Sequence, residues 1–181
     1  MLLQNHPDRN SQSQMRNELI LETIIEALKF IFPAYCANAA PVIFGRGKPL
    51  DMGKKFLDGK PIFGENKTFG GFISGLIIGT LVGFAESIFF DYPTFFGFIT
   101  AFGALIGDLV KSFIKRRLGK KPGEILPLAD QLDFVLGAVA FSLLIKPPRI
   151  EVFIIVLIIT PPIHLVTNYF AYLLKLKRTP F

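Results

Sequence analysis

Residues 107–137 carry the side chains whose types and spacing are best suited to chemistry. The stretch begins in an apolar segment, crosses a short basic loop and enters another apolar segment. Asp108 lies before the loop, and Asp130 and Asp133 lie after it. A carboxylate next to lipid is costly, so we expect these groups to face a site rather than the bilayer. Acidic groups that flank a basic cluster can hold Mg2+ and an anionic phosphate together.

The basic cluster between these carboxylates comprises Lys115, Arg116, Arg117, Lys120 and Lys121. In a helix, Asp108, Ser112 and Lys115 are spaced by four and three residues and share one face. A plain row of basic anchors at the membrane interface would explain the cluster without any site. It would leave Asp108 unexplained, because this residue lies in an otherwise apolar run.

Asp130 and Asp133 also have a simple structural interpretation. Asp130 is a candidate N-cap of the following helix, and Asp133 would then lie near the positive end of its dipole. This explanation is weaker for Asp133, which would lie beside the bilayer. Because Asp108 and Asp133 belong to adjacent helix ends, they could share one metal ion.

A second candidate anion site is formed by Lys67 and Thr68, which follow a glycine and precede an apolar segment. The free amides and the dipole at a helix start favour phosphate oxygens. The simple alternative is that Thr68 only caps the helix while Lys67 extends to the membrane interface.

Composition indicates that these sites belong to a membrane protein. Of the 181 residues, 51% are hydrophobic, 20 are Phe, and the formal net charge is +6; the mean hydropathy is +0.47. The single cysteine, Cys36, excludes an internal disulfide and a multi-cysteine metal site. We expect a polar segment over residues 1–17, frayed or folded against the surface, and one membrane domain over residues 18–181.

The fold class predicted is an all-α integral membrane protein with about five transmembrane helices. Pro33 and Pro41 should kink or end the first helix, and the fourth span is short for a bilayer. His164, in the fifth span, is expected to be an interior histidine. The predicted spans are residues 19–44, 69–90, 94–113, 131–145 and 150–174.

The second span carries four glycines, Gly71, Gly75, Gly79 and Gly83, at a spacing of four residues. They predict a face against which a neighbouring backbone packs closely. The same face could serve a homo-oligomer.

The distribution of basic residues predicts the orientation. Six of the 20 Lys and Arg residues lie in residues 45–67, six in residues 111–124 and three after Leu174, and all fall on one side of a five-span chain. The positive-inside rule makes that side cytoplasmic, with the N-terminus outside and the C-terminus inside. Any chemistry should then use the two cytoplasmic loops, about 45–67 and 114–130. Because the basic residues flank apolar spans, no nucleic-acid partner is expected.

These residues carry a family resemblance. The order Gly107-Asp108-Leu109, Ser112, Lys115-Arg116, Leu126-Pro127 and Asp133 resembles the CDP-diacylglycerol synthase superfamily. The bacterial PGHGG run is replaced by LADQ, and Phe134 replaces an arginine. The DQLD form, the ANAAP run around Asn38 and the PLDMGKKFLDGKPIFG run resemble the archaeal branch, the CDP-archaeol synthases. Gly70 occupies a position where that family often has an arginine.

The resemblance implies a Mg2+-dependent transfer of CMP from CTP to a prenylated glycerol phosphate lipid at the cell membrane. It implies that Asp108 and Asp133 hold Mg2+, with Asp130 as a further or alternative ligand, and that Asp108, Lys115 and Asp133 are catalytic. The implied CTP-binding residues are Asn38, Lys67, Thr68, Ser112, Lys115 and Arg116. Arg117, Lys120 and Lys121 are expected to attract anions or contact lipid headgroups.

Three other functions remain open at this stage. The first is a bacterial-type enzyme that acts on phosphatidic acid, against which the absent PGHGG run counts. A small transporter would also fit intramembrane charge, but it usually places polar residues near the midplane and in repeats. An anchor that binds anionic lipid would leave Asp108 and Asp133 without a role.

Overall fold

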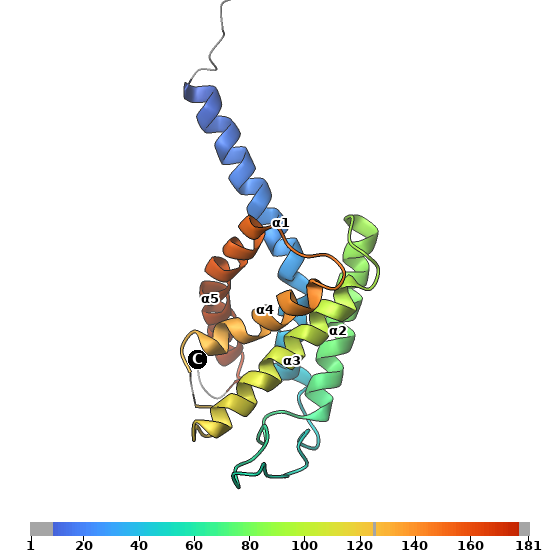
Figure 1. Ribbon diagram of the computed structural model, residues 1–181, viewed down its shortest axis with the longest axis vertical. Helices are drawn as coiled ribbons and strands as arrows, with labels where there is room; N and C mark the ends of the chain where they lie inside the picture. The colour runs from blue at the N-terminus through green and yellow to red at the C-terminus, as the bar shows by residue number, and fades with distance from the viewer. Residues whose placement is uncertain (1–8, 125, 178–181) are drawn as a thin grey trace, which may run out of the picture.

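The computed structural model describes residues 9–124 and 126–177, and this part of the chain forms five helices and no β-strand (Figure 1). Two isolated β-bridges lie in the loop between the first two helices. The helices are α1 (Arg9–Phe44), α2 (Phe69–Phe89), α3 (Phe96–Arg117), α4 (Ala129–Ser142) and α5 (Ile150–Leu173).

Two helix boundaries differ clearly from those predicted, and of the two alternatives given for Pro33 and Pro41 the helix end is excluded. Residues 9–17, expected to form a separate polar segment, are the first turns of α1. Pro33 and Pro41 both lie inside α1, so neither ends it. α3 continues to Arg117 and takes in part of the predicted basic loop, because the side chains of Lys115 and Arg116 are buried on its inner face.

The glycine face of α2 packs against α1 and α3, as predicted. A Cβ atom at Gly79 would lie 2.5 Å from the Cβ of Ala101, and one at Gly83 would lie 2.1 Å from the Cα of Gly97. Contacts this short require glycine on α2. Because the face is occupied within the chain, it gives no support to a homo-oligomer.

α3 and α4 also approach each other closely, backbone to backbone. A Cβ atom at Gly137 would lie 2.1 Å from the carbonyl oxygen of Gly103, and one at Gly107 would lie 2.3 Å from that of Asp133. The three glycines therefore define the crossing of these helices. The crossing brings the segment after Gly107 on α3 against the first turns of α4.

The core between α1, α3, α4 and α5 is aromatic and aliphatic. Phe96, Phe134 and Val156 are almost completely buried in it. The ring of Phe134, the residue that departs from the bacterial pattern, lies 5.7 Å from that of Tyr35 and 6.2 Å from that of His164. Phe134 is therefore a packing residue that joins α4 to α1 and α5.

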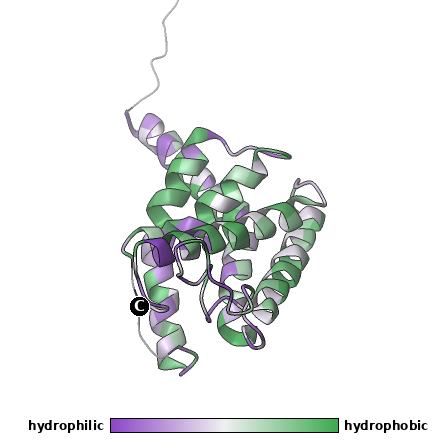
Figure 2. Ribbon diagram, turned by 60° about the horizontal axis from the view of Figure 1, so that its bottom comes forward, coloured by the Kyte–Doolittle hydropathy of each residue, from purple (hydrophilic) through white to green (hydrophobic). Residues whose placement is uncertain are grey.

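The outer surface is apolar. On α2, the side chains of Ile73, Ile77, Leu81 and Ile88 are each more than half exposed, on the face opposite the glycines. Figure 2 shows helices mainly in the apolar colour, with polar residues gathered at the loops and at the start of α1. Among the described helices, α2, α3 and α5 are long and apolar enough to cross a membrane. The chain is thus a multi-pass membrane protein, and α4, with 14 residues, is short for a crossing.

The long loop between α1 and α2, the α3–α4 connection and the end of α5 lie toward one end of the molecule (Figure 1). The α2–α3 and α4–α5 connections lie toward the other end. The basic segments therefore gather at one end, and we refer to it as the loop end.

The α3–α4 crossing can be tested with Gly137→Val. The added side chain would overlap the carbonyl of Gly103, and overpacking of this kind costs about 1–3 kcal/mol. We expect a clear fall in the thermal unfolding temperature in detergent. Leu136→Val, a change at the neighbouring half-exposed position, should leave the temperature nearly unchanged. Equal stability of the two variants would contradict the close crossing.

Candidate active site

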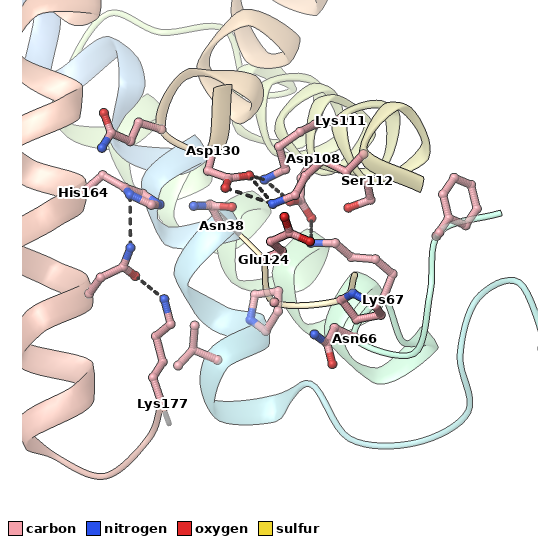
Figure 3. A pocket seen from close by; sticks show the side chains of 18 of the residues that line it. Asn38, Asn66, Lys67, Asp108, Lys111, Ser112, Glu124, Asp130, His164 and Lys177 are labelled. Carbon is pink, nitrogen blue, oxygen red and sulfur yellow. Dashed lines mark hydrogen bonds and ion pairs between the residues drawn. The ribbon is translucent and has the colours of Figure 1, made fainter. Parts of the chain in front are cut away.

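A cavity of about 570 Å³ opens at the loop end, and side chains from α1, α3, α4, α5 and both loops line it (Figure 3). Seven of the nine predicted site residues lie on its wall, whereas Thr68 and Asp133 do not. The seven are Asn38, Lys67, Asp108, Ser112, Lys115, Arg116 and Asp130.

The centre of the site is Lys111, which was absent from the predicted set. Its ammonium lies 3.1 Å from Asp108 Oδ1, 3.3 Å from Asp130 Oδ1 and 2.7 Å from Asp133 Oδ2. Lys111 is one turn after Asp108 in an apolar helix, and that spacing was the available signal. Its contacts with Asp130 and Asp133 depend on the α3–α4 crossing, which the sequence did not reveal.

Two further lysines complete an electrostatic cluster around these carboxylates. Lys67 forms an ion pair and a hydrogen bond with Asp108. Lys115 donates to both carboxylate oxygens of Asp130 at 2.9 Å. We call Asp108, Asp130, Asp133, Lys67, Lys111 and Lys115 the charged cluster. Three carboxylates and three ammonium groups balance each other, so an anion that binds a lysine of this cluster has to take it from an acidic partner.

Arg116 differs from these lysines, because its guanidinium is only partly paired. The side chain is 5% exposed and lines the cavity. It donates to the carbonyl oxygen of Lys121 at 3.1 Å. Its Nε and Nη1 atoms are buried and have no hydrogen-bond partner in the described part of the chain. Buried donors of this kind are costly unless a ligand satisfies them, and a phosphate oxygen matches them well.

Thr68 is the N-cap of α2, as its simple structural interpretation proposed. Its buried hydroxyl accepts a hydrogen bond from the Gly71 amide at 3.1 Å. Leu128, not Asp130, occupies the N-cap position of α4, so that expectation was wrong. The carboxylate of Asp130 instead accepts from the Leu126 amide at 2.6 Å and holds the end of the α3–α4 connection.

The loop between α1 and α2 brings Lys67 to the cavity, and Asp51 organises this loop. The Asp51 carboxylate accepts hydrogen bonds from the amides of Gly53, Phe63 and Gly64 at 2.9–3.0 Å. Burial would raise the pKa of Asp51, but these hydrogen bonds outweigh it and hold the pKa below its ordinary value. Asp51 therefore acts as a structural anion within the loop.

Gly70 occupies the position where the related family often has an arginine, and the local structure explains why a glycine is present. A Cβ atom there would lie 2.1 Å from the carbonyl oxygen of Arg46. The close approach of the loop to the start of α2 leaves no space for a side chain, and an arginine is excluded in this arrangement.

Arg117 and Lys120 have structural partners rather than free charges. Arg117 pairs with Asp58 at 3.0 Å and lies over the rings of Phe56 and Phe113, so it fastens the first loop to the end of α3. Lys120 pairs with Glu124. These contacts give both side chains a structural role, while Nε and Nη1 of Arg117 are buried without a hydrogen-bond partner in the described residues. That Arg117 and Lys120 attract anions stays a prediction.

The opposite wall of the cavity is formed by α5 and the residues after it. His164 Nδ1 lies 3.1 Å from Asn168 Nδ2, and Lys177 donates to Asn168 Oδ1 at 3.0 Å. His164, expected to be an interior histidine, is only partly buried and lines the cavity. Asn168 and Lys177 were not among the predicted site residues; they reach the cavity because the chain turns back after α5.

The charged cluster has the donor chemistry of a hard-cation site. Three carboxylates converge on one ammonium, and carboxylate oxygens are the ligands that Mg2+ prefers. No group of three or more His, Cys, Asp or Glu side chains is already arranged around a metal position in the described residues. The residues therefore fit Mg2+ only if Lys111 moves away from the carboxylates.

Asp51→Asn should loosen the first loop, because an amide cannot accept from three backbone N–H groups as a carboxylate does. We expect faster hydrogen exchange over residues 51–64 at neutral pH, measured by mass spectrometry. Since the folded-state pKa is lowered, the wild-type protection should persist above the ordinary Asp pKa of about 3.9 and be lost as the pH falls through the folded-state value. Glu65→Gln, an exposed change in the same loop, is the control. Equal exchange in both variants would remove this role for Asp51.

Comparison with known proteins assigns the chain to a family. A family model described as CarS-like CDP-archaeol synthase matches residues 20–181. CDP-archaeol synthase of Methanocaldococcus jannaschii is 42% identical over 85% of this chain and 95% of its own length, and that of Pyrococcus furiosus is 42% identical over 89% and 100%. A solved structure of an intramembrane enzyme for archaeal membrane lipid biosynthesis is 38% identical, with a TM-score of 0.75 over 80% of this chain and 94% of that chain. This chain therefore belongs to the CDP-archaeol synthase family.

Proposed function

We propose that the chain transfers CMP from CTP to 2,3-di-O-geranylgeranyl-glycerol 1-phosphate and releases pyrophosphate. Family membership makes it a CTP-using cytidylyltransferase of archaeal lipid synthesis. The observation that carries the assignment to this cavity is the charged cluster, which lies beside the buried, partly unpaired guanidinium of Arg116. Family membership favours this enzyme over the transporter and anchor interpretations.

The reaction requires two anions to approach each other, because the lipid phosphate attacks the α-phosphorus of CTP. Arg116 offers buried donors to the triphosphate. Lys67 and Lys115 would add positive charge when they leave their aspartate partners and pair with phosphate oxygens instead. Preorganised charges in a partly dry site stabilise such a transition state more than water does. No general base is needed, because the lipid phosphate is already ionised near neutral pH.

Asp108 and Asp133 would hold Mg2+, with Asp130 as the further carboxylate. Bound there, Mg2+ would neutralise triphosphate oxygens and orient them. The ammonium of Lys111 lies between the three carboxylates and offsets their mutual repulsion. We infer that its ammonium turns toward the triphosphate when the cation binds.

We place the loop end in the cytoplasm, where CTP is found. The gathering of the basic segments at this end supports the orientation through the positive-inside rule. The lipid would enter from the bilayer, beside the polar cavity.

The double variant Asp108→Asn, Asp133→Asn should lose nearly all turnover and remain folded. The change keeps side-chain size and the glycine contacts, but Lys67 and Lys111 lose carboxylate partners, so the thermal unfolding temperature should fall while the crossing persists. Product formation and the thermal unfolding temperature should be measured together. Asp91→Asn, at an exposed position in the α2–α3 connection, is the control. Wild-type turnover in the double variant would refute the carboxylate assignment.

The function itself is tested with purified protein, Mg2+, CTP labelled at the α-phosphate, and one of two lipids. We expect label to enter the organic phase with the geranylgeranyl ether phosphate and to remain in the aqueous phase with phosphatidic acid. Omission of Mg2+ should abolish transfer. Transfer to phosphatidic acid alone would indicate the bacterial-type reaction. Binding of CTP without transfer to either lipid would show that the acceptor is wrong.

A further inference from the structure

A second cavity, of about 380 Å³, lies between α1 and α5 and has mainly apolar walls. It shares Asn38, Val42, His164 and Asn168 with the polar cavity. The two cavities therefore meet along a common wall of α1 and α5. A lipid phosphate has an anionic head and apolar chains, and it would place the head at this junction.

Two consecutive residues after α5 are divided between the apolar and the polar cavity in the same way. Leu176 lines the apolar cavity, and its neighbour Lys177 lines the polar one. Two consecutive residues thus present an apolar side chain and a cation on the two sides of the junction.

A helix-ending motif holds this segment in place. Lys175 has φ 59°, the Leu176 amide donates to the Ala171 carbonyl at 2.9 Å, and the Lys175 amide donates to the Tyr172 carbonyl at 2.9 Å. These two bonds and the left-handed residue form a Schellman motif, which reverses the chain at a helix end. Lys177 is therefore directed back to the cavity by backbone geometry.

Lys177 is also the cavity lysine that does not use a carboxylate. Lys67, Lys111 and Lys115 each form an ion pair with an aspartate. Lys177 donates to the side-chain oxygen of Asn168, and no ion pair of it is found among the described residues. An ammonium has three donors, so two are not used by Asn168. Burial lowers the pKa of Lys177, which an anion bound beside it would offset.

We propose that Lys177, held by Asn168, binds the phosphate of the lipid acceptor at the junction of the two cavities. This inference rests on the proposed function and names the residue that positions the attacking group. His164 fixes Asn168 from the other side and packs on Phe134, so the α5 wall is preorganised (Figure 3). The triphosphate would lie against the opposite wall, at the charged cluster and Arg116.

The test compares Lys177→Met with Lys175→Met. Lys175 carries the same charge two residues earlier, is exposed and does not line either cavity. Loss of a charged hydrogen bond to phosphate should raise the KM for the lipid phosphate about tenfold or more. The KM for CTP should stay within about twofold of wild type, since the nucleotide is held elsewhere. Lys177→Arg should recover most of the lipid KM.

Several results would overturn the assignment. An unchanged lipid KM in Lys177→Met would remove it, and a rise in the CTP KM alone would assign Lys177 to the nucleotide. An equal rise in Lys175→Met would indicate a general surface-charge effect. Should Lys177→Met be misfolded, as shown by a thermal unfolding temperature in detergent well below that of wild type, Asn168→Ala replaces it, and the lipid KM must rise there too.

If the proposed function is wrong, the assay gives a result that differs from all of those above. Wild-type protein would then transfer no label to either lipid. In that case, direct binding of the ether phosphate to wild type and to Lys177→Met, measured by native mass spectrometry, decides whether Lys177 recognises a lipid phosphate. Equal binding by the two proteins would reject the inference.

Discussion

The site depends on the backbone contact between α3 and α4. Gly103, Gly107 and Gly137 let the two helices cross so closely that a single Cβ atom would overlap a carbonyl oxygen. This crossing places Asp108 and Lys111 of α3 against Asp130 and Asp133 of α4. Wider separation would leave the carboxylates of Asp130 and Asp133 without the lysines of α3, at a cost that a membrane protein rarely tolerates. The crossing of α3 and α4 therefore determines both the helix packing and the arrangement of the charged side chains.

The charges around that point are arranged for ligands that are themselves highly charged. In the charged cluster each lysine lies against at least one carboxylate, which offsets part of the cost of burying these charges. Arg116 retains buried donors without partners in the described residues and gives the cavity a preference for anions. A triphosphate that brings a divalent cation can exchange with these internal pairs and keep the charge balanced. Under the proposed function, the same exchange would let one cavity accommodate two anionic reactants.

Features that depend on local sequence could be predicted, and those that depend on tertiary contacts could not. Helical periodicity placed Asp108, Ser112 and Lys115 on one face, and all three line the cavity. The glycine spacing of α2 correctly indicated a packing face. The run after Phe113 looked like a basic loop, but burial of Lys115 and Arg116 keeps it helical. Lys111 and Lys177 were missed because one depends on the α3–α4 crossing and the other on the turn after α5.

The measurement that tests the account most directly is a structure of the protein with CTP and Mn2+, with the metal located by its anomalous signal. The account predicts Mn2+ within about 2.2 Å of carboxylate oxygens of Asp108 and Asp133. It also predicts that Lys111 no longer lies between the carboxylates and that Arg116 contacts the triphosphate. A metal held by other residues, or CTP bound while Lys111 still bridges Asp108, Asp130 and Asp133, would contradict it.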